Sequence, residues 1–400
     1  MLTKRRIDIA MGREPADLVM TNGHIVNVFT REILEGELAI ADGMIAGIGP
    51  NGTYSGTEQV DVQGGYVVPG FIDSHVHIES SLVSPEQFAR LVVPFGTTTI
   101  VADPHEIANV AGLDGIRYMI NAARDVPLDV WFMLPSCVPS TSFENAGAVL
   151  DAAALAELID DPAILGLGEM MDYPSLLAAD AGVLAKIALA ADRGKRIDGH
   201  APMVIGQDLV AYRAGGIETD HECSTVAEMQ ERLRLGLRVL IREGSAARNL
   251  ATLVAGLTPA TMRRCSFCTD DKQPEDILNE GHINYNVRLA IQNGVAPLTA
   301  IQMATLNAAE GYGLTRKGAL APGYDADVVI LDDLESCSVR DVYKNGVHVA
   351  RAGAALFSVT APDTASVTGS VNVADLSIER FQLSLTSDRA VVIGVRPDDL

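Results

Sequence analysis

The sequence predicts an α/β protein whose main part is a (β/α)8 barrel of the TIM type, with a small β-sandwich-like domain formed jointly by the two flanking segments. Two observations predict the barrel. Eight short apolar runs occur between residues 67 and 270, and each is followed by a helix-like segment. Strands that alternate with helices at this spacing form a parallel sheet, and eight such units close a barrel.

Most of the runs end in residues that suit metal or proton chemistry. In chain order the runs begin at Val67, Thr97, Val130, Ile164, Arg196, Gly216, Leu237 and Cys265. The reactive residues at their ends are His75 and His77, Asp103 and His105, Glu169, His200, His221, Arg242 and Asp270. Because the carboxyl ends of barrel strands converge on one face, these side chains are expected to be neighbours in space.

The first run ends in the sequence His75-Val-His77. Side chains at positions i and i+2 of a strand lie on the same face, so the two imidazoles can bind a single metal ion without distorting the backbone. Alone, such a pair is more often two polar residues where a strand meets a loop. The further histidines at other strand ends favour the metal site.

The segments that flank the barrel do not show the alternation of apolar runs and helix-like segments. Asn22-Gly23 and Asp42-Gly43 predict tight turns before the barrel, and Asn345-Gly346 predicts one after it. We expect residues 1–66 and 318–359 to form one composite β-domain and residues 67–317 to form the barrel. Residues 360–400 are expected to be the start of a further β-rich domain that the chain does not complete.

Composition and charge exclude several classes of partner. The 400 residues are 48% hydrophobic, which suits a large α/β core, and no apolar stretch approaches the length of a membrane span. The formal net charge of −22 repels phosphate backbones, so nucleic acid is an unexpected partner and a small neutral or cationic substrate is favoured.

The five cysteines, an odd number in a large domain, favour reduced thiols and a cytoplasmic location. Cys265 and Cys268 have the spacing of a metal or redox pair. They have no partner pair and lie in a predicted buried strand, so this alternative is disfavoured.

Two motifs of a superfamily and five motifs of a narrower family within it carry a resemblance. Pro69–His77 and Gly323–Leu331, together with the split β-domain, resemble the amidohydrolase superfamily. Within it, the segments that resemble the bacterial adenine deaminases are 77–81, 102–110, 197–202, 219–222 and 268–272. The resemblance implies hydrolysis of free adenine to hypoxanthine and ammonia in purine salvage or catabolism. It also implies a C-terminal domain longer than this chain contains.

The resemblance implies two divalent metal ions. His75, His77 and Asp270 would bind one ion, His200 and His221 the other, and Glu169 would bridge them, since two close cations need an anion between them. The imidazole and carboxylate set admits Mn, Fe or Zn and does not discriminate among them. The resemblance favours Mn or Fe. A hydroxide formed at the ions would attack C6 of the purine, with Asp270 and Glu169 as the catalytic carboxylates and Asp270 carrying the proton.

His105, Glu106 and Arg242 are candidates for contact with the purine ring, because they close the second and seventh runs. The alternative roles are hydrogen bonding to the metal-binding histidines and ion pairing at the rim. A homodimer is the expected assembly.

Two other functions stay open at this point. One is a cyclic amide hydrolase, resembling hydantoinases or dihydroorotases, on the same scaffold. The lack of a lysine where Glu169 stands counts against it. The other is a barrel without enzymatic activity that serves in assembly, which would be expected to lack several of the metal-binding residues, and none is missing.

Overall fold

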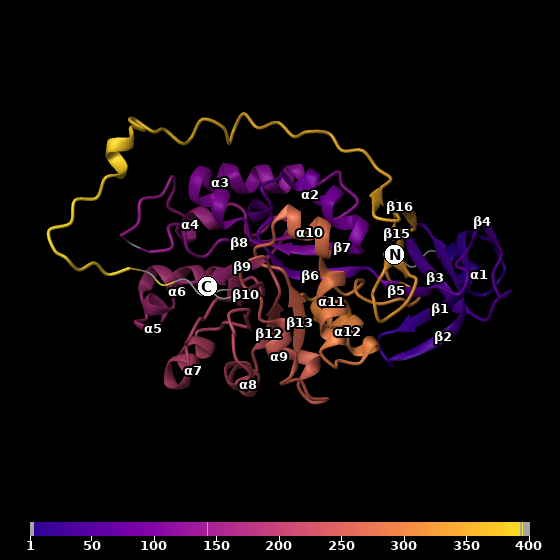
Figure 1. Cartoon of the computed structure of the whole chain (residues 1–400). Helices are drawn as coiled ribbons and strands as arrows, with labels where there is room; N and C mark the ends of the chain where they lie inside the picture. Colours follow the sequence, from indigo (N-terminus) through magenta and orange to yellow (C-terminus); the bar gives the residue numbers. More distant parts are fainter. Residues whose placement is uncertain (1–3, 142, 393, 395–400) are drawn as a thin grey trace.

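A computed structural model describes residues 4–141, 143–392 and 394 of the chain, and its central part is the predicted barrel (Figure 1). The eight parallel strands are β6 (Phe71–Val76), β7 (Thr97–Ala102), β8 (Asp129–Leu134), β9 (Ile164–Met170), β10 (Arg196–Gly199), β11 (Thr219–Asp220), β12 (Arg238–Arg242) and β13 (Cys265–Cys268). They lie in the hydrogen-bonded orders β10-β9-β8-β7-β6 and β11-β12-β13. The eight predicted strands and the α/β fold class are therefore confirmed.

Backbone hydrogen bonds close the barrel between these two groups of strands. The amide of Glu218 donates to the carbonyl of Ile197 at 2.9 Å, which connects β10 with β11. On the other side, the amide of Asp270 donates to the carbonyl of His75 at 2.9 Å, and the amide of His77 donates to the carbonyl of Asp270 at 3.1 Å. The first and last strands are thus joined at the residues predicted to bind metal.

Helices follow the strands and cover the barrel from outside. They are α2 (Pro85–Val92), α3 (His105–Ala122), α4 (Ala152–Leu155), α5 (Tyr173–Leu177), α6 (Ala181–Ala191), α7 (Gly206–Ala214), α8 (Val226–Arg234), α9 (Leu250–Val254), α10 (Pro274–Glu280), α11 (Ile283–Gln292), α12 (Pro297–Met303) and α13 (Leu306–Tyr312). Helix α8 begins with a capping box, in which the Thr225 hydroxyl accepts a bond from the amide of Glu228 and the Glu228 carboxylate accepts one from the amide of Thr225. Buried apolar side chains, among them Phe132 and Ile241, fill the space between the strands and the helices.

The two flanks share one nine-stranded sheet. Its strands are β1 (Ala16–Asn27), β2 (Glu32–Ala41), β3 (Met44–Gly49), β4 (Gly56–Asp61), β5 (Tyr66–Pro69), β14 (Val328–Leu331), β15 (Val339–Lys344), β16 (Val347–Arg351) and β17 (Ala354–Ala355), with the short helix α1 (Lys4–Ala10) beside them. The antiparallel pair β5 and β14 joins the part before the barrel to the part after it. The exact domain boundaries stay a prediction.

Two local predictions were wrong. Asn22-Gly23 is not a turn between two strands but an irregularity inside β1, with a register shift between Met20 and Gly23. The reason is tertiary, because β1 pairs with β2 on one side and with β4 and β5 on the other, which keeps it extended. The apolar run from Val67 to His77 is also two strands, since the chain leaves the nine-stranded sheet at Gly70 and enters the barrel at Phe71.

The predicted turns at Asp42-Gly43 and Asn345-Gly346 are confirmed. Asp42 and Asn345 adopt left-handed backbone conformations, with φ angles of 52° and 48°. Each turn joins two antiparallel strands, β2 with β3 and β15 with β16.

After β17 the chain continues as a long, exposed segment that passes along the outside of the barrel (Figure 1). Its described part, residues 356–392 and 394, contains a short 3-10 helix at Ile378–Phe381 and no strand. The predicted start of a β-rich domain over residues 360–400 stays a prediction. The last apolar run, residues 390–395, lies partly outside the described residues.

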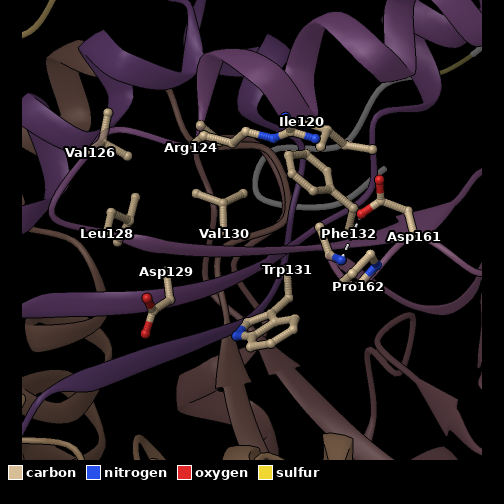
Figure 2. Close-up of a pocket in the computed structure, with 12 residues that line it drawn as sticks. Ile120, Arg124, Val126, Leu128, Asp129, Val130, Trp131, Phe132, Asp161 and Pro162 are labelled. Atoms are coloured by element: carbon tan, nitrogen blue, oxygen red, sulfur yellow. Dashed lines mark hydrogen bonds between the residues drawn. The ribbon is translucent and has the colours of Figure 1, made fainter.

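A groove of about 390 Å³ lies at the amino ends of β8 and β9, opposite the carboxyl face of the barrel. Val130 and Phe132 point into it beneath α3, whereas Trp131 points to the other side of β8 (Figure 2). None of the predicted reactive residues lines this groove. Within the described residues, no helix is long and apolar enough to cross a membrane.

Candidate metal centre

The six residues predicted to bind metal come together at the carboxyl face of the barrel. His75, Glu169 and His221 each offer a donor atom within 4.8 Å of the others, and so do His75, His77 and Asp270. Five of the six side chains are almost fully buried, while His200 keeps 26% of its side chain exposed. The structure therefore places the predicted set in one buried cluster whose open side is at His200.

The first half of the cluster lies between β6 and β13. The Nε2 atoms of His75 and His77 lie 3.5 and 3.3 Å from Oδ1 of Asp270. Asp270 has a left-handed backbone with a φ angle of 57°, which is unusual for a residue with a side chain. Its backbone hydrogen bonds with His75 and His77 hold this conformation, in which the carboxylate faces the two imidazoles.

Glu169 lies at the centre of the cluster. Its Oε1 atom is 3.3 Å from Nε2 of His77, and its Oε2 atom is 2.9 Å from Nδ1 of His200 and 3.2 Å from Nε2 of His221. Oε1 thus faces His77 in the first half, while Oε2 faces the second half and also lies 3.8 Å from Nε2 of His75. The side chain is 5% exposed, so Glu169 is not an ordinary surface carboxylate.

The second half contains a residue that sequence reasoning missed as a site residue, Glu222. His200, His221 and Glu222 each offer a donor atom within 4.8 Å of the others. The Oε1 atom of Glu222 lies 3.5 Å from Nδ1 of His200 and 3.4 Å from Nε2 of His221. Its position directly after His221 was the available signal.

The electrostatics of the cluster keep its carboxylates anionic. Burial opposes protonation of the imidazoles, but the facing carboxylates, among them Glu169, hold the pKa of His77 and His221 well above the usual range. Burial raises the pKa of Asp270, but the imidazoles of His75 and His77 outweigh it and keep that pKa well below its usual range. Burial likewise opposes the ionisation of Glu169, yet His77, His200 and His221 hold its pKa well below its usual range. Burial lowers the pKa of His75 and so favours the neutral, ligating form.

One further observation supports the fit to a metal. The Nε2 atom of His75 is buried and has no hydrogen-bond partner within the described part of the chain. An unpaired buried nitrogen is costly unless something binds it, and it faces two anionic carboxylates. The donor set of imidazoles and carboxylates is one that divalent transition metals prefer.

The three predicted purine contacts border the same cluster. Nδ1 of His105 lies 2.6 Å from Oδ1 of Asp103 and 3.5 Å from Oε1 of Glu169. Glu106 is 48% exposed, and its Oε2 atom lies 3.5 Å from Nδ1 of His77. Arg242 is buried and donates to Oδ2 of Asp270 at 2.7 Å. Their role in binding a substrate stays a prediction.

The other histidines lie away from these donors. His282 is fully buried, with Nδ1 2.8 Å from Oγ1 of Thr97, and its pKa is well below the usual range because of burial. In the nine-stranded sheet, His348 lies 2.8 Å from Asp341 and His24 contacts Tyr66. Cys265 and Cys268 are free, buried thiols.

Comparison with known proteins gives the same picture. Residues 66–349 match the model of the Amidohydrolase family. An adenine deaminase of Nitratidesulfovibrio vulgaris (strain DP4) is 56% identical over 396 residues, which cover 98% of this chain and 68% of that protein. The chain belongs to the adenine deaminases of the amidohydrolase family. An adenine deaminase of Clostridium acetobutylicum is 50% identical over 393 residues, again 98% of this chain and 68% of the relative.

Solved structures of lower identity share the fold. A β-aspartyl dipeptidase of Fervidobacterium islandicum AW-1 superposes with a TM-score of 0.63 at 14% identity and covers 84% of this chain and 98% of its own. The atrazine chlorohydrolase TrzN of Arthrobacter aurescens TC1, complexed with zinc, has a TM-score of 0.63 at 16% identity and covers 85% and 97%. The amidohydrolase family uses divalent metal ions, and the cluster at the barrel mouth supplies donors for them.

Proposed function

We propose that this chain hydrolyses free adenine to hypoxanthine and ammonia, as a step of purine salvage or catabolism. The observation that carries the proposal is the identity of about one half to adenine deaminases over nearly the whole chain. The cluster of four imidazoles and two carboxylates at the barrel mouth supports it, because it provides both the metal donors and a base.

The proposed centre contains two divalent ions, with Mn or Fe favoured and Zn possible. His75, His77 and Asp270 would bind one ion and His200 and His221 the other, and Glu169 would lie between them. When bound, the ions supply Lewis acidity that makes water nucleophilic near neutral pH. The distances of 3.3 Å and 2.9 Å from the two Glu169 oxygens to His77 and His200 support the bridging role.

In this proposal Asp270 is the proton carrier. It is anionic, since its pKa lies well below the usual range, and it can accept a proton from water as the water oxygen bonds to C6. The same proton then passes to the departing amino group, so that ammonia leaves and hypoxanthine remains. Glu169 acts by keeping the two halves of the centre together.

We propose that His105 and Glu106 contact the purine. His105 is 7% exposed and its Nδ1 faces Oδ1 of Asp103 at 2.6 Å, whereas its Nε2 has no hydrogen-bond partner within the described residues, so Nε2 can pair with a purine nitrogen. Glu106 is the most exposed of the acidic groups close to His77 and can reach the exocyclic amine at the entrance. Arg242 is a weaker third candidate, because both of its terminal nitrogens already donate to Asp270 or Glu222 and only its buried Nε lacks a partner within the described residues.

The decisive experiment is an adenine deamination assay on this chain, with the metal content measured on the same sample. We expect turnover of adenine, about two ions per chain at saturation, loss of activity with a chelator and recovery with Mn or Fe. Adenosine should not react, because the proposed substrate is the free base adenine. Turnover by metal-free protein, or equal rates on adenosine, would contradict the proposal.

The two rival functions are tested in parallel. Dihydropyrimidines and hydantoins serve as substrates for a cyclic amide hydrolase, and the ultraviolet spectrum follows either reaction. A metal-loaded chain that turned over neither class would favour a barrel without enzymatic activity.

We further propose a homodimer that works in the cytoplasm without nucleic acid or membrane partners. The five cysteines are all free, as expected of a reducing compartment. Light scattering coupled to size exclusion would measure the assembly, and a monomer at micromolar concentration would contradict it.

A further inference from the structure

We propose that Arg242 and Glu222 form a positioning unit that fixes the orientation of the Asp270 carboxylate, and that neither residue contacts the substrate. The inference rests on the proposed function, because Asp270 is the proton carrier there. It assigns roles to two charged residues outside the six that are proposed to bind the ions.

Arg242 lies between the two residues that it binds. It is the last residue of β12, while Glu222 follows β11 and Asp270 follows β13, so one acidic residue comes from each neighbouring strand. Nη1 of Arg242 donates to Oδ2 of Asp270 at 2.7 Å and also to Oε1 of Glu222. Nη2 donates to Oε2 of Glu222 at 3.2 Å. Both terminal nitrogens of the guanidinium are therefore engaged by the protein.

Because of this contact, the two oxygens of Asp270 have different partners. Oδ2 is bound by Arg242, whereas Oδ1 faces His75 and His77 at 3.5 and 3.3 Å. A carboxylate on a single rotatable bond would otherwise turn and offer either oxygen. By binding Oδ2, Arg242 prevents this rotation and keeps Oδ1 directed at the reacting centre.

Glu222 determines how Arg242 binds. Its two oxygens accept from both terminal nitrogens, so the guanidinium can give Asp270 only one hydrogen bond. Without Glu222, the planar guanidinium would be free to bind Asp270 through both nitrogens and turn Oδ1 away from the histidines. Glu222 also lies within 3.5 Å of His200 and 3.4 Å of His221, so it links the two halves of the cluster.

Burial makes the unit rigid. The side chains of Arg242, Glu222 and Asp270 are 3%, 8% and 7% exposed. Water can replace little of this pairing, and a lysine, which has a point charge in place of a planar fork, cannot bind both carboxylates in this geometry. A purine could pair with either terminal nitrogen of the guanidinium only by displacing one of these buried contacts.

The test compares Arg242→Ala, Arg242→Lys and Glu222→Gln with the unmodified chain at saturating metal. We expect kcat for adenine to fall by roughly 10- to 100-fold in each, with KM and metal content nearly unchanged. Added guanidinium should restore part of kcat in Arg242→Ala. The matched control is Arg238→Ala at the other end of the same strand, where Arg238 donates to the carbonyl of Asn307 and guanidinium should have no effect.

A second readout does not depend on turnover. The visible spectrum of the cobalt(II)-loaded chain reports ligand geometry, so Arg242→Ala should change it, and guanidinium should shift it back. If the unmodified chain deaminates no adenine, the proposed function fails, and the cobalt spectra still decide the positioning role. A rise in KM at constant kcat, loss of metal in Glu222→Gln, or an unchanged cobalt spectrum in Arg242→Ala would overturn this inference.

Discussion

Arg232 of α8 and Asp220 of β11 form an ion pair with 2.7 Å between Nε and Oδ2, and both side chains are completely buried. Both residues also bind Ala201. Oδ1 of Asp220 accepts from its amide at 3.1 Å, and Nη2 of Arg232 donates to its carbonyl at 2.6 Å. Because Ala201 follows His200 and Asp220 precedes His221, the pair connects the two strand ends that carry the second half of the metal centre.

Arg232→Met should destabilise the chain and weaken this half of the centre. It leaves the Asp220 carboxylate buried without its cation, which typically costs about 3–5 kcal/mol. Urea unfolding should show a lower midpoint, and the metal content should fall because His200 and His221 are no longer held together. Arg234→Met, two positions along α8 at an exposed site, is the control. Equal unfolding midpoints for the two variants would contradict the role assigned to the pair.

The stability of the chain should depend on pH through Glu243. This side chain is buried and accepts a hydrogen bond from the amide of Leu250 at 3.2 Å. Burial raises its pKa from 4.5 to about 7. Between these values the folded chain keeps a proton that the unfolded chain has released, so this contribution to the free energy of unfolding decreases as pH rises from about 4.5 to about 7.

Glu243→Gln removes this titration. Urea unfolding near the two ends of that pH range should therefore show a smaller loss of stability in Glu243→Gln than in the unmodified chain. Glu275→Gln, which changes an exposed carboxylate at the start of α10, should keep the original pH dependence. An identical pH dependence in all three proteins would show that Glu243 titrates as it does in the unfolded chain.

The main effect of Glu169→Gln should be loss of metal from the centre. The substitution keeps the shape of the side chain but removes the negative charge that lies between His77, His200 and His221. After dialysis the variant should retain fewer ions per chain than Asp270→Asn, whose change affects one half of the centre. Full retention of two ions by Glu169→Gln would contradict the bridging role.

The barrel and its donors could be predicted because their signals are local. A buried parallel strand is a short apolar run, and the residue after the run lies at the carboxyl face whatever the rest of the chain does. His75, Glu169, His200, His221 and Asp270 all follow this rule, so strand order alone brought them together. The turns at Asp42-Gly43 and Asn345-Gly346 have the same local character.

The remaining features depend on contacts that a sequence pattern does not contain. Asn22-Gly23 has the composition of a turn, yet pairing on both sides keeps β1 extended through it. Arg232 lies on an amphipathic helix, where an arginine usually faces solvent, and its burial follows only from its pairing with Asp220. The engagement of Arg242 by Glu222 and Asp270 joins residues from three strands.

Variants at two adjacent aspartates can separate proton transfer by Asp270 from its binding of metal. Asp270→Asn keeps an oxygen for the metal but removes the basic carboxylate, so the rate on adenine should fall by roughly two to four orders of magnitude while much of the metal remains. Asp271 is the matched control, because its carboxylate accepts from the hydroxyl of Ser80 and its carbonyl from the amide of Ser245. Asp271→Asn should therefore keep near-normal turnover. If Asp271→Asn were the inactive variant and Asp270→Asn the active one, the proton transfer proposed for Asp270 would be wrong.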